Sequence, residues 1–192
     1  MNRFRTIKKI LNEHRAFSLA EMLIAILILL MVSSVVTAGI PAAQGAYEKV
    51  VKTTNAEVLL STTISTLRNE LGTARDVSVN NNAVTYYNES TGAFSSISKG
   101  EYEYSTKVKV NTILYQQYVA VEGLTDKKSN AVPLISEAVS TSDLYVTYSG
   151  VSYDEDNGIV EFTDISVNDA DPDAAVKTLA GPRTIQIRVI SY

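Results

Sequence analysis

The longest apolar stretch of the chain lies near its N-terminus. From Met22 to Tyr47 there are 26 consecutive residues without a formal charge, and the front of this run is almost wholly aliphatic. About 20 helical residues cross the hydrocarbon core of a bilayer at roughly 1.5 Å per residue, so the run is long enough to span a membrane. The sequence contains no second run of this kind. We therefore expect one transmembrane helix over residues 17–45.

Apolar positions continue at helical spacing in residues 46–76, and the period then changes. This second stretch predicts an amphipathic helix that ends between Gly72 and Asp76 and lies against a sheet. Residues 77–192 contain alternating, β-rich runs bounded by Asn, Gly, Ser and Asp. The predicted fold class is α+β: a long N-terminal helix, transmembrane in its first half and amphipathic in its second, packed on a C-terminal antiparallel sheet of four to seven strands. The apolar stripe comprises Leu60, Ile64, Leu67, Leu71 and Ala74.

Some details of the β-rich part can also be predicted. Alternating side chains in Tyr102–Val110 indicate one half-solvated antiparallel strand. The pair Asn157-Gly158 is typical of a hairpin turn. Residues 168–183 read as a loop of about 16 residues, which is longer than a turn needs and suits variable surface contacts. Ten of the eleven tyrosines lie from Tyr86 onward, which suits either strands exposed on a surface or binding of a partner.

The formal net charge of −4 is unevenly distributed. The first 16 residues carry five basic side chains against the single acid Glu13, whereas the other 176 residues hold 12 basic and 20 acidic side chains. Basic residues that flank an apolar segment are retained on the cytoplasmic side of a membrane. We therefore expect a single-pass cell-membrane protein whose residues 1–16 stay inside and whose chain after about residue 45 is exported.

The junction between the basic and apolar parts reads Arg15-Ala16-Phe17-Ser18-Leu19-Ala20-Glu21 and is followed at once by the apolar run. It resembles the processing site of type IV prepilins and pseudopilins. The resemblance covers residues 1 to about 45 closely, and the β-rich part, residues 77–192, only in architecture. It implies that residues 1–16 are a leader, cut between Ala16 and Phe17 by a prepilin peptidase, and that the new amine of Phe17 is methylated. The family usually has Gly before the cut, where this chain has the similarly small Ala16.

Two interpretations of Glu21 are compatible with each other. Ser18 and Glu21 have the spacing of a capping box, and an acid suits the positive end of a helix dipole. An unpaired carboxylate entering an apolar layer, however, costs on the order of several kcal/mol. Cleavage creates an α-amine at Phe17, and the family resemblance implies that Glu21 of one subunit meets this amine of its neighbour. Such a pair would set the register of a filament.

The uncharged run contains two further features with alternative explanations. Gly39 and Pro41 interrupt its helical pattern, and a proline inside a helix removes a hydrogen bond. These residues predict either a simple kink near the outer membrane interface or a hinge that bends on assembly. In addition, Val36-Thr37-Ala38 resembles the end of a cleaved secretory signal, which is the competing interpretation of the whole N-terminal segment.

Candidate chemistry is sparse. The sequence has no cysteine, and its one histidine, His14, falls in the predicted leader, so we expect no enzyme activity and no cofactor. Two acidic clusters could supply oxygen ligands to calcium, although neither has EF-hand spacing, and solvated turns are the alternative. The candidate ligands are Asp154, Asp156, Asp169, Asp171 and Asp173.

The sequence therefore predicts a structural subunit of a bacterial type IV pilus or of a secretion or competence filament. Its expected partners are the prepilin peptidase and N-methyltransferase, other pilin subunits, the membrane and the inner-membrane assembly machinery. The alternative is a membrane-anchored or secreted binding module that never polymerises. The acidic body argues against direct DNA binding, although four lysines could form a local basic patch, and the lack of cysteine favours a Gram-positive host. These lysines are Lys107, Lys109, Lys127 and Lys128.

Overall fold

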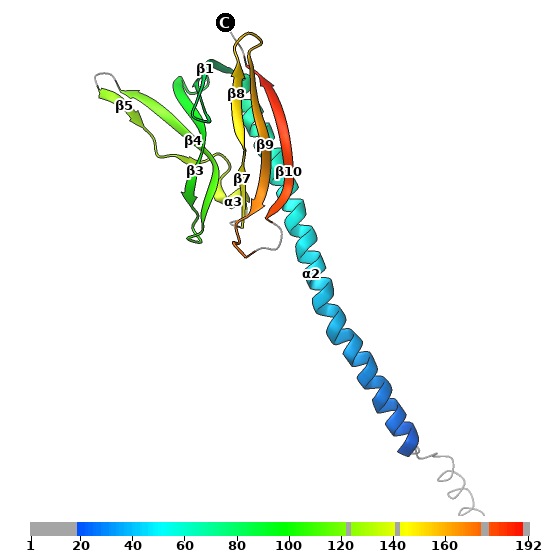
Figure 1. Cartoon of the computed structure of the whole chain (residues 1–192). Coiled ribbons are helices and arrows are strands. Elements are labelled where there is room, and N and C mark those ends of the chain that lie inside the picture. The colour runs from blue at the N-terminus through cyan, green and yellow to red at the C-terminus, as the bar shows by residue number, and fades with distance from the viewer. Residues whose placement is uncertain (1–18, 122–123, 141–142, 174–176, 190–192) are drawn as a thin grey trace, which may run out of the picture. The chain divides into compact units, whose positions relative to one another are not determined.

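The computed structural model describes residues 19–121, 124–140, 143–173 and 177–189 (Figure 1). It confirms the α+β class, with one long N-terminal helix, α2, and antiparallel β-structure after it. The chain forms two units, residues 1–49 and 50–192, and we call the second unit the head. The elements in chain order are α2 (Leu19–Gly72), β1 (Ala74–Asn80), β2 (Ala83–Asn88), β3 (Ala93–Glu103), β4 (Lys109–Val121), β5 (Leu124–Lys128), β6 (Val132–Pro133), α3 (Glu137–Ser140), β7 (Leu144–Thr147), β8 (Gly150–Asp154), β9 (Ile159–Asp169) and β10 (Thr178–Arg188).

The part of α2 within the head packs its apolar side into the core, as the sequence predicts. The helix ends at Gly72, at the start of the predicted interval. The stripe is confirmed apart from Ile64, which is half-buried, and Ala74, which is buried but belongs to β1. Because four of the buried side chains recur at steps of three and four residues, this part of the helix has one buried side. The buried residues of α2 are Ala56, Leu59, Leu60, Thr63, Leu67 and Leu71.

The head contains two antiparallel sheets, where the sequence analysis expected one. The first has the order β1-β2-β3-β4-β5, with β6 also paired to β4, and the second has the order β10-β9-β7, with β8 also paired to β9. Both sheets contribute to one hydrophobic core with α2, for example through Tyr86 and Ile97 from the first and Val160 and Phe162 from the second. Alternation of side chains marks strands but does not say which strands share a sheet.

The predicted strand Tyr102–Val110 is wrong, because the chain reverses direction within it. Strand β3 ends at Glu103 and β4 begins at Lys109, with Glu103 paired to Lys109. The backbone N–H of Lys107 donates to the Tyr104 carbonyl at 2.8 Å, and Lys107 has a φ of 63°. The Tyr104 side chain is buried, and its hydroxyl donates to the Leu144 carbonyl of β7 at 3.2 Å. This tertiary contact anchors the turn, and a local pattern does not reveal it.

Strand residues occupy both ends of the predicted loop over residues 168–183. Strand β9 continues to Asp169 and β10 already begins at Thr178. Gly181 and Pro182 lie within β10, which is an edge strand and therefore tolerates a residue without an N–H. Gly181 has a φ of 87°, and a Cβ at this position would lie 2.5 Å from the carbonyl oxygen of Ile165. Glycine is therefore required at this irregularity of the ladder.

Asn82 joins the two sheets. It lies in the turn between β1 and β2 with a φ of 63°. Its side chain donates to the Ser149 carbonyl at 3.0 Å and accepts the backbone N–H of Val151 at 3.0 Å. The Asn82 amide therefore provides hydrogen-bond partners for two backbone groups at the turn between β7 and β8. Its own carbonyl accepts the hydroxyl of Tyr148, a buried side chain whose pKa is raised to about 12 because burial disfavours the phenolate.

We expect Asn82→Gly to lower the free energy of unfolding of the head by about 1–2 kcal/mol, because two side-chain hydrogen bonds are lost while the left-handed backbone is kept. The measurement is urea unfolding of the full chain in detergent, followed by circular dichroism. Asn81→Gly is the matched control, since Asn81 also has a positive φ, of 49°. Equal losses in the two variants would contradict the role of the Asn82 amide.

Candidate functional site

The most conspicuous surface of the chain is the first part of α2, residues 19–51, which we call the apolar segment. All of its side chains are exposed. Soluble proteins rarely expose contiguous apolar patches larger than a few hundred Å², so this surface needs a membrane or a partner. Within the described residues α2 is the one helix that is long and apolar enough to cross a membrane, by length and composition. Its exposed large apolar residues include Met22, Leu23, Ile24, Ile26, Leu27, Ile28, Leu29, Leu30, Met31 and Val32.

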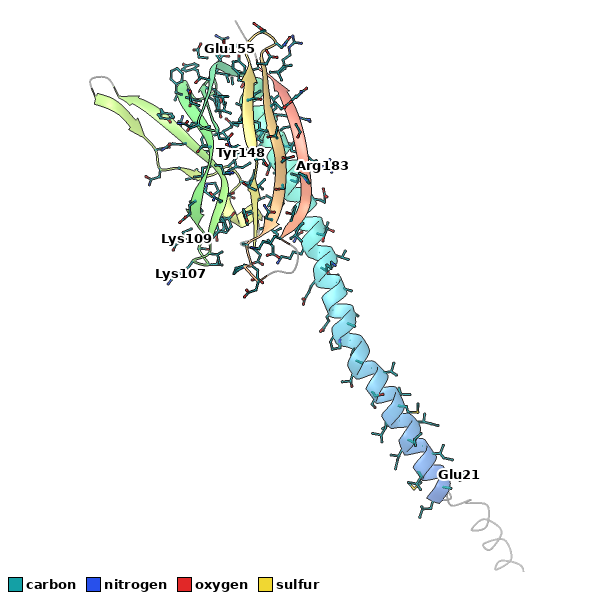
Figure 2. The ribbon with its side chains drawn as sticks, in the orientation of Figure 1. Glu21, Lys107, Lys109, Tyr148, Glu155 and Arg183 are labelled. Carbon is teal, nitrogen blue, oxygen red and sulfur yellow. The ribbon has the colours of Figure 1, made fainter. Side chains whose placement is uncertain are left out.

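Glu21 lies in the first turn of this helix, directly before the uncharged run (Figure 2). Its side chain is exposed, and the free N–H groups of a helix start favour a negative charge there. The predicted cleavage site, Ala16 and Phe17, and the proposed capping residue Ser18 lie outside the described residues. The two interpretations of Glu21, capping and register, both stay predictions.

The helix runs without interruption through Gly39 and Pro41. Because Pro41 has no N–H, the carbonyl of Thr37, four residues earlier, receives no helical hydrogen bond from it. The Thr37 hydroxyl donates to the Ser33 carbonyl at 2.8 Å. It therefore does not replace the hydrogen bond that the Thr37 carbonyl lacks. A Cβ on Gly39 would meet no atom of the chain within 4 Å. Kink and hinge therefore both stay predictions at this position.

The first acidic cluster is the turn between β8 and β9, which confirms the predicted hairpin. Gly158 has a φ of 61°, as a tight turn requires. The Asp154 carboxylate accepts the backbone N–H of Asn157 at 3.2 Å and its side-chain amide at 2.7 Å. These donors lower the pKa of Asp154, which is therefore ionised at neutral pH. Glu155 and Asp156 are exposed beside it.

The second acidic cluster is used differently. Asp169, at the end of β9, forms an ion pair with Lys52 of α2 at 2.6 Å, and the Asp169 side chain is only 6% exposed. Its other oxygen accepts the backbone N–H of Asp171 at 3.0 Å, and Asp171 in turn accepts the N–H of Asp173 at 3.0 Å. Among the residues that the structure describes, no three His, Cys, Asp or Glu side chains gather as metal ligands.

The lysines do not form a basic patch in the described part of the head. Lys109 pairs with Glu101 at 2.9 Å, and this neighbour together with Glu103 raises the pKa of Lys109. Lys107 is exposed at the same turn. The side chains of Lys127 and Lys128 fall outside the described ones. The acids Glu101 and Glu103 therefore offset the positive charge that the sequence suggested here.

Several tyrosines that the sequence suggested for exposed strands are core residues. Tyr86 is fully buried, and its hydroxyl donates to the Glu70 carboxylate of α2 at 3.0 Å. Asn88 donates to the same Glu70 oxygen at 2.9 Å. Burial, followed by the neighbouring Glu70 charge, raises the pKa of Tyr86 well above its usual value. The sequence did not indicate this role of Glu70, because nothing near Glu70 in the chain marks Tyr86, 16 residues away, as its partner.

A groove of about 530 Å³ runs between α2 and β10 in the head. No sequence motif marked it, since its two walls are more than 100 residues apart in the chain. Its charged residues are Glu57 and Arg68 from α2 and Arg183 from β10, and Arg183 lies 3.6 Å from Glu57. The remaining residues of its lining are Leu60, Ser61, Ile64, Ser65, Thr184 and Ile185.

We expect millimolar calcium to leave the melting temperature of the full chain in detergent unchanged. The carboxylates of Asp154, Asp169 and Asp171 already accept backbone N–H groups, the Asn157 amide or the Lys52 ammonium group, and the described carboxylates do not converge. Circular dichroism with and without calcium measures this, with magnesium as the control cation. A rise of several degrees that is specific to calcium would instead support a calcium site.

Comparison with known proteins identifies no relative of this chain: no family model, no curated protein and no solved structure matches it. The chain has an α+β fold and, in its described part, one candidate membrane-spanning helix near the N-terminus. This helix is compatible with a single-pass membrane protein.

Proposed function

We propose that the chain is a pilin-like structural subunit, made as a single-pass membrane precursor and polymerised through the apolar segment into a bacterial surface filament of the type IV pilus, secretion or competence kind. The observation that carries the proposal is the placement of Glu21. It follows the Ala16-Phe17 junction, lies in the first turn of α2 and borders 26 uncharged residues.

Electrostatics explains why this placement matters. Moving a carboxylate into an apolar layer costs on the order of several kcal/mol unless a cation accompanies it, and the 26 residues that follow Glu21 carry no formal charge. Cleavage after Ala16 would place a new ammonium group four residues before Glu21. The amine of one subunit then pairs with the carboxylate of its neighbour. A buried pair adds little net stability, but a wrong register strands both charges, so the pair selects one register.

This function requires specific partners. A prepilin peptidase and N-methyltransferase processes the leader, an inner-membrane assembly machinery moves subunits out of the bilayer, and other pilin subunits take up the apolar segment. The subunit itself is a building block and not an enzyme. A membrane-anchored module that binds a partner without polymerising has the same fold and the same helix, and the register role of Glu21 separates the two functions.

Mass spectrometry of the exported protein tests the processing step. We expect a mature chain that begins with N-methylated Phe17, because the prepilin peptidase recognises the junction before the apolar segment. A chain that begins after Ala38 would identify a secretory signal, and a filament whose subunits retain Met1 would contradict the proposal. Ala16→Gly is the matched variant, and it should be processed at least as completely as the natural chain.

Glu21→Ala tests the assembly step. We expect processing to continue while the yield of sheared filaments falls strongly, because the Phe17 amine loses its partner. Glu48→Ala is the matched control, since Glu48 is the acid at the other border of the same uncharged run. Immunoblots of the sheared fraction and of membranes measure both effects. Normal filaments from Glu21→Ala would remove the register role and favour the non-polymerising module.

A further inference from the structure

The groove between α2 and β10 presents unbalanced positive charge over an apolar floor. Arg183 is exposed and shares the weak 3.6 Å contact with Glu57, while Arg68 forms no ion pair within the described residues. The floor is closed by the buried side chains of Leu60 and Ile185. Serine and threonine hydroxyls line the remainder of the groove. A volume of about 530 Å³ lies within the ~300–1,000 Å³ typical of binding clefts, and the charges favour an anionic occupant.

The head also presents a compact anionic element. The turn between β8 and β9 carries Asp154, Glu155 and Asp156 in succession, and all three are exposed. None of them forms an ion pair in the part of the chain that the structure describes. Arg188 lies opposite Ile159 in the pairing of β9 with β10, next to this turn, and forms no ion pair with it there. The hairpin hydrogen bonds of Asp154 hold the turn in one shape, so it can dock without a large ordering cost.

We propose that the groove of one copy binds the β8–β9 turn of a second copy. This inference rests on the proposed function and adds a contact between heads to the contact between apolar segments. In this contact Arg68 and Arg183 face the carboxylates of Glu155 and Asp156. The hydroxyl groups of the groove form hydrogen bonds with the remaining polar atoms of the turn. The two guanidinium groups outnumber the one carboxylate of Glu57, and this positive charge is opposite in sign to the three acids of the turn.

The position of the two elements on the head determines the kind of assembly. Figure 2 shows Glu155 at one end of the head and Arg183 on its flank. When each copy donates its turn to one neighbour and accepts the turn of another neighbour in its groove, the contact is heterologous. Such contacts propagate into open helical polymers unless the rotation closes a ring. The proposed contact therefore suits a filament, in which the turn of each copy lies in the groove of the next.

The absence of cysteine from the sequence permits a direct test in the full chain. Two differently tagged chains are expressed together, one with Ser65→Cys in the groove and one with Glu155→Cys in the turn, and cells are oxidised before non-reducing electrophoresis. We expect a disulfide-linked pair that carries both tags. The control replaces Glu155→Cys by Thr106→Cys, which lies in the exposed turn between β3 and β4. The control pair should give only background.

The charges are tested in the same assay. Arg183→Glu in the Ser65→Cys chain should lower the cross-linked fraction about fivefold or more, because an attractive pair becomes a repulsive one. Asp156→Arg in the Glu155→Cys chain should restore it. Neither residue lies in the processing site, so both chains should still be cleaved.

The outcomes separate this inference from the proposed function. No mixed-tag product, or equal product from the Thr106→Cys control, overturns the docking of the turn, even where filaments form normally. An unchanged cross-link after Arg183→Glu overturns its electrostatic basis. The behaviour of Glu21→Ala, by contrast, decides polymerisation through the apolar segment and does not depend on this contact.

Discussion

The apolar segment of α2 must leave water, and the proposed function follows from that requirement. Full burial of a Leu or Ile side chain contributes about 1.5–3 kcal/mol, and this segment exposes a continuous series of them. A bilayer can cover it, and so can the same segment of other copies. The two coverings differ in what they require of the Glu21 carboxylate. A carboxylate at the border of the apolar layer is tolerated near the membrane surface, but inside a bundle of helices it requires a cation.

One helix serves two environments because its sequence changes character along its length. Its first part is exposed on all sides, whereas from Ala56 to Leu71 one side enters the core of the head. Polar contacts also attach α2 to both sheets: Glu70 accepts hydrogen bonds from the first sheet, and Lys52 pairs with Asp169 of the second. The head therefore depends on α2 for its own core, and a chain without residues 56–71 would lose this hydrophobic support.

The two proposals concern different parts of this chain and different forces. Apolar segments associate without directional specificity, so a charge pair is needed to select a register. The contact between heads differs from this association, because the groove and the β8–β9 turn are polar, exposed and distinct in shape. Contacts of that kind contribute specificity and orientation more than affinity. Apolar segments would then associate with little specificity by themselves. The Glu21 pair would select their register, and the contact between groove and turn would orient the heads.

Elements that depend on local pattern could be predicted from the residues alone. The apolar run, the end of α2 near Gly72, the hairpin at Gly158 and the α+β class follow from period, length and turn chemistry, which are properties of neighbouring residues. The division into two sheets and the reversal at Tyr104 could not be predicted in this way. The same holds for the strand through Pro182 and the groove at Arg183. Each of these depends on a contact between distant segments, such as Asn82 with Val151 or Tyr104 with Leu144, and such contacts form only when the whole chain has folded.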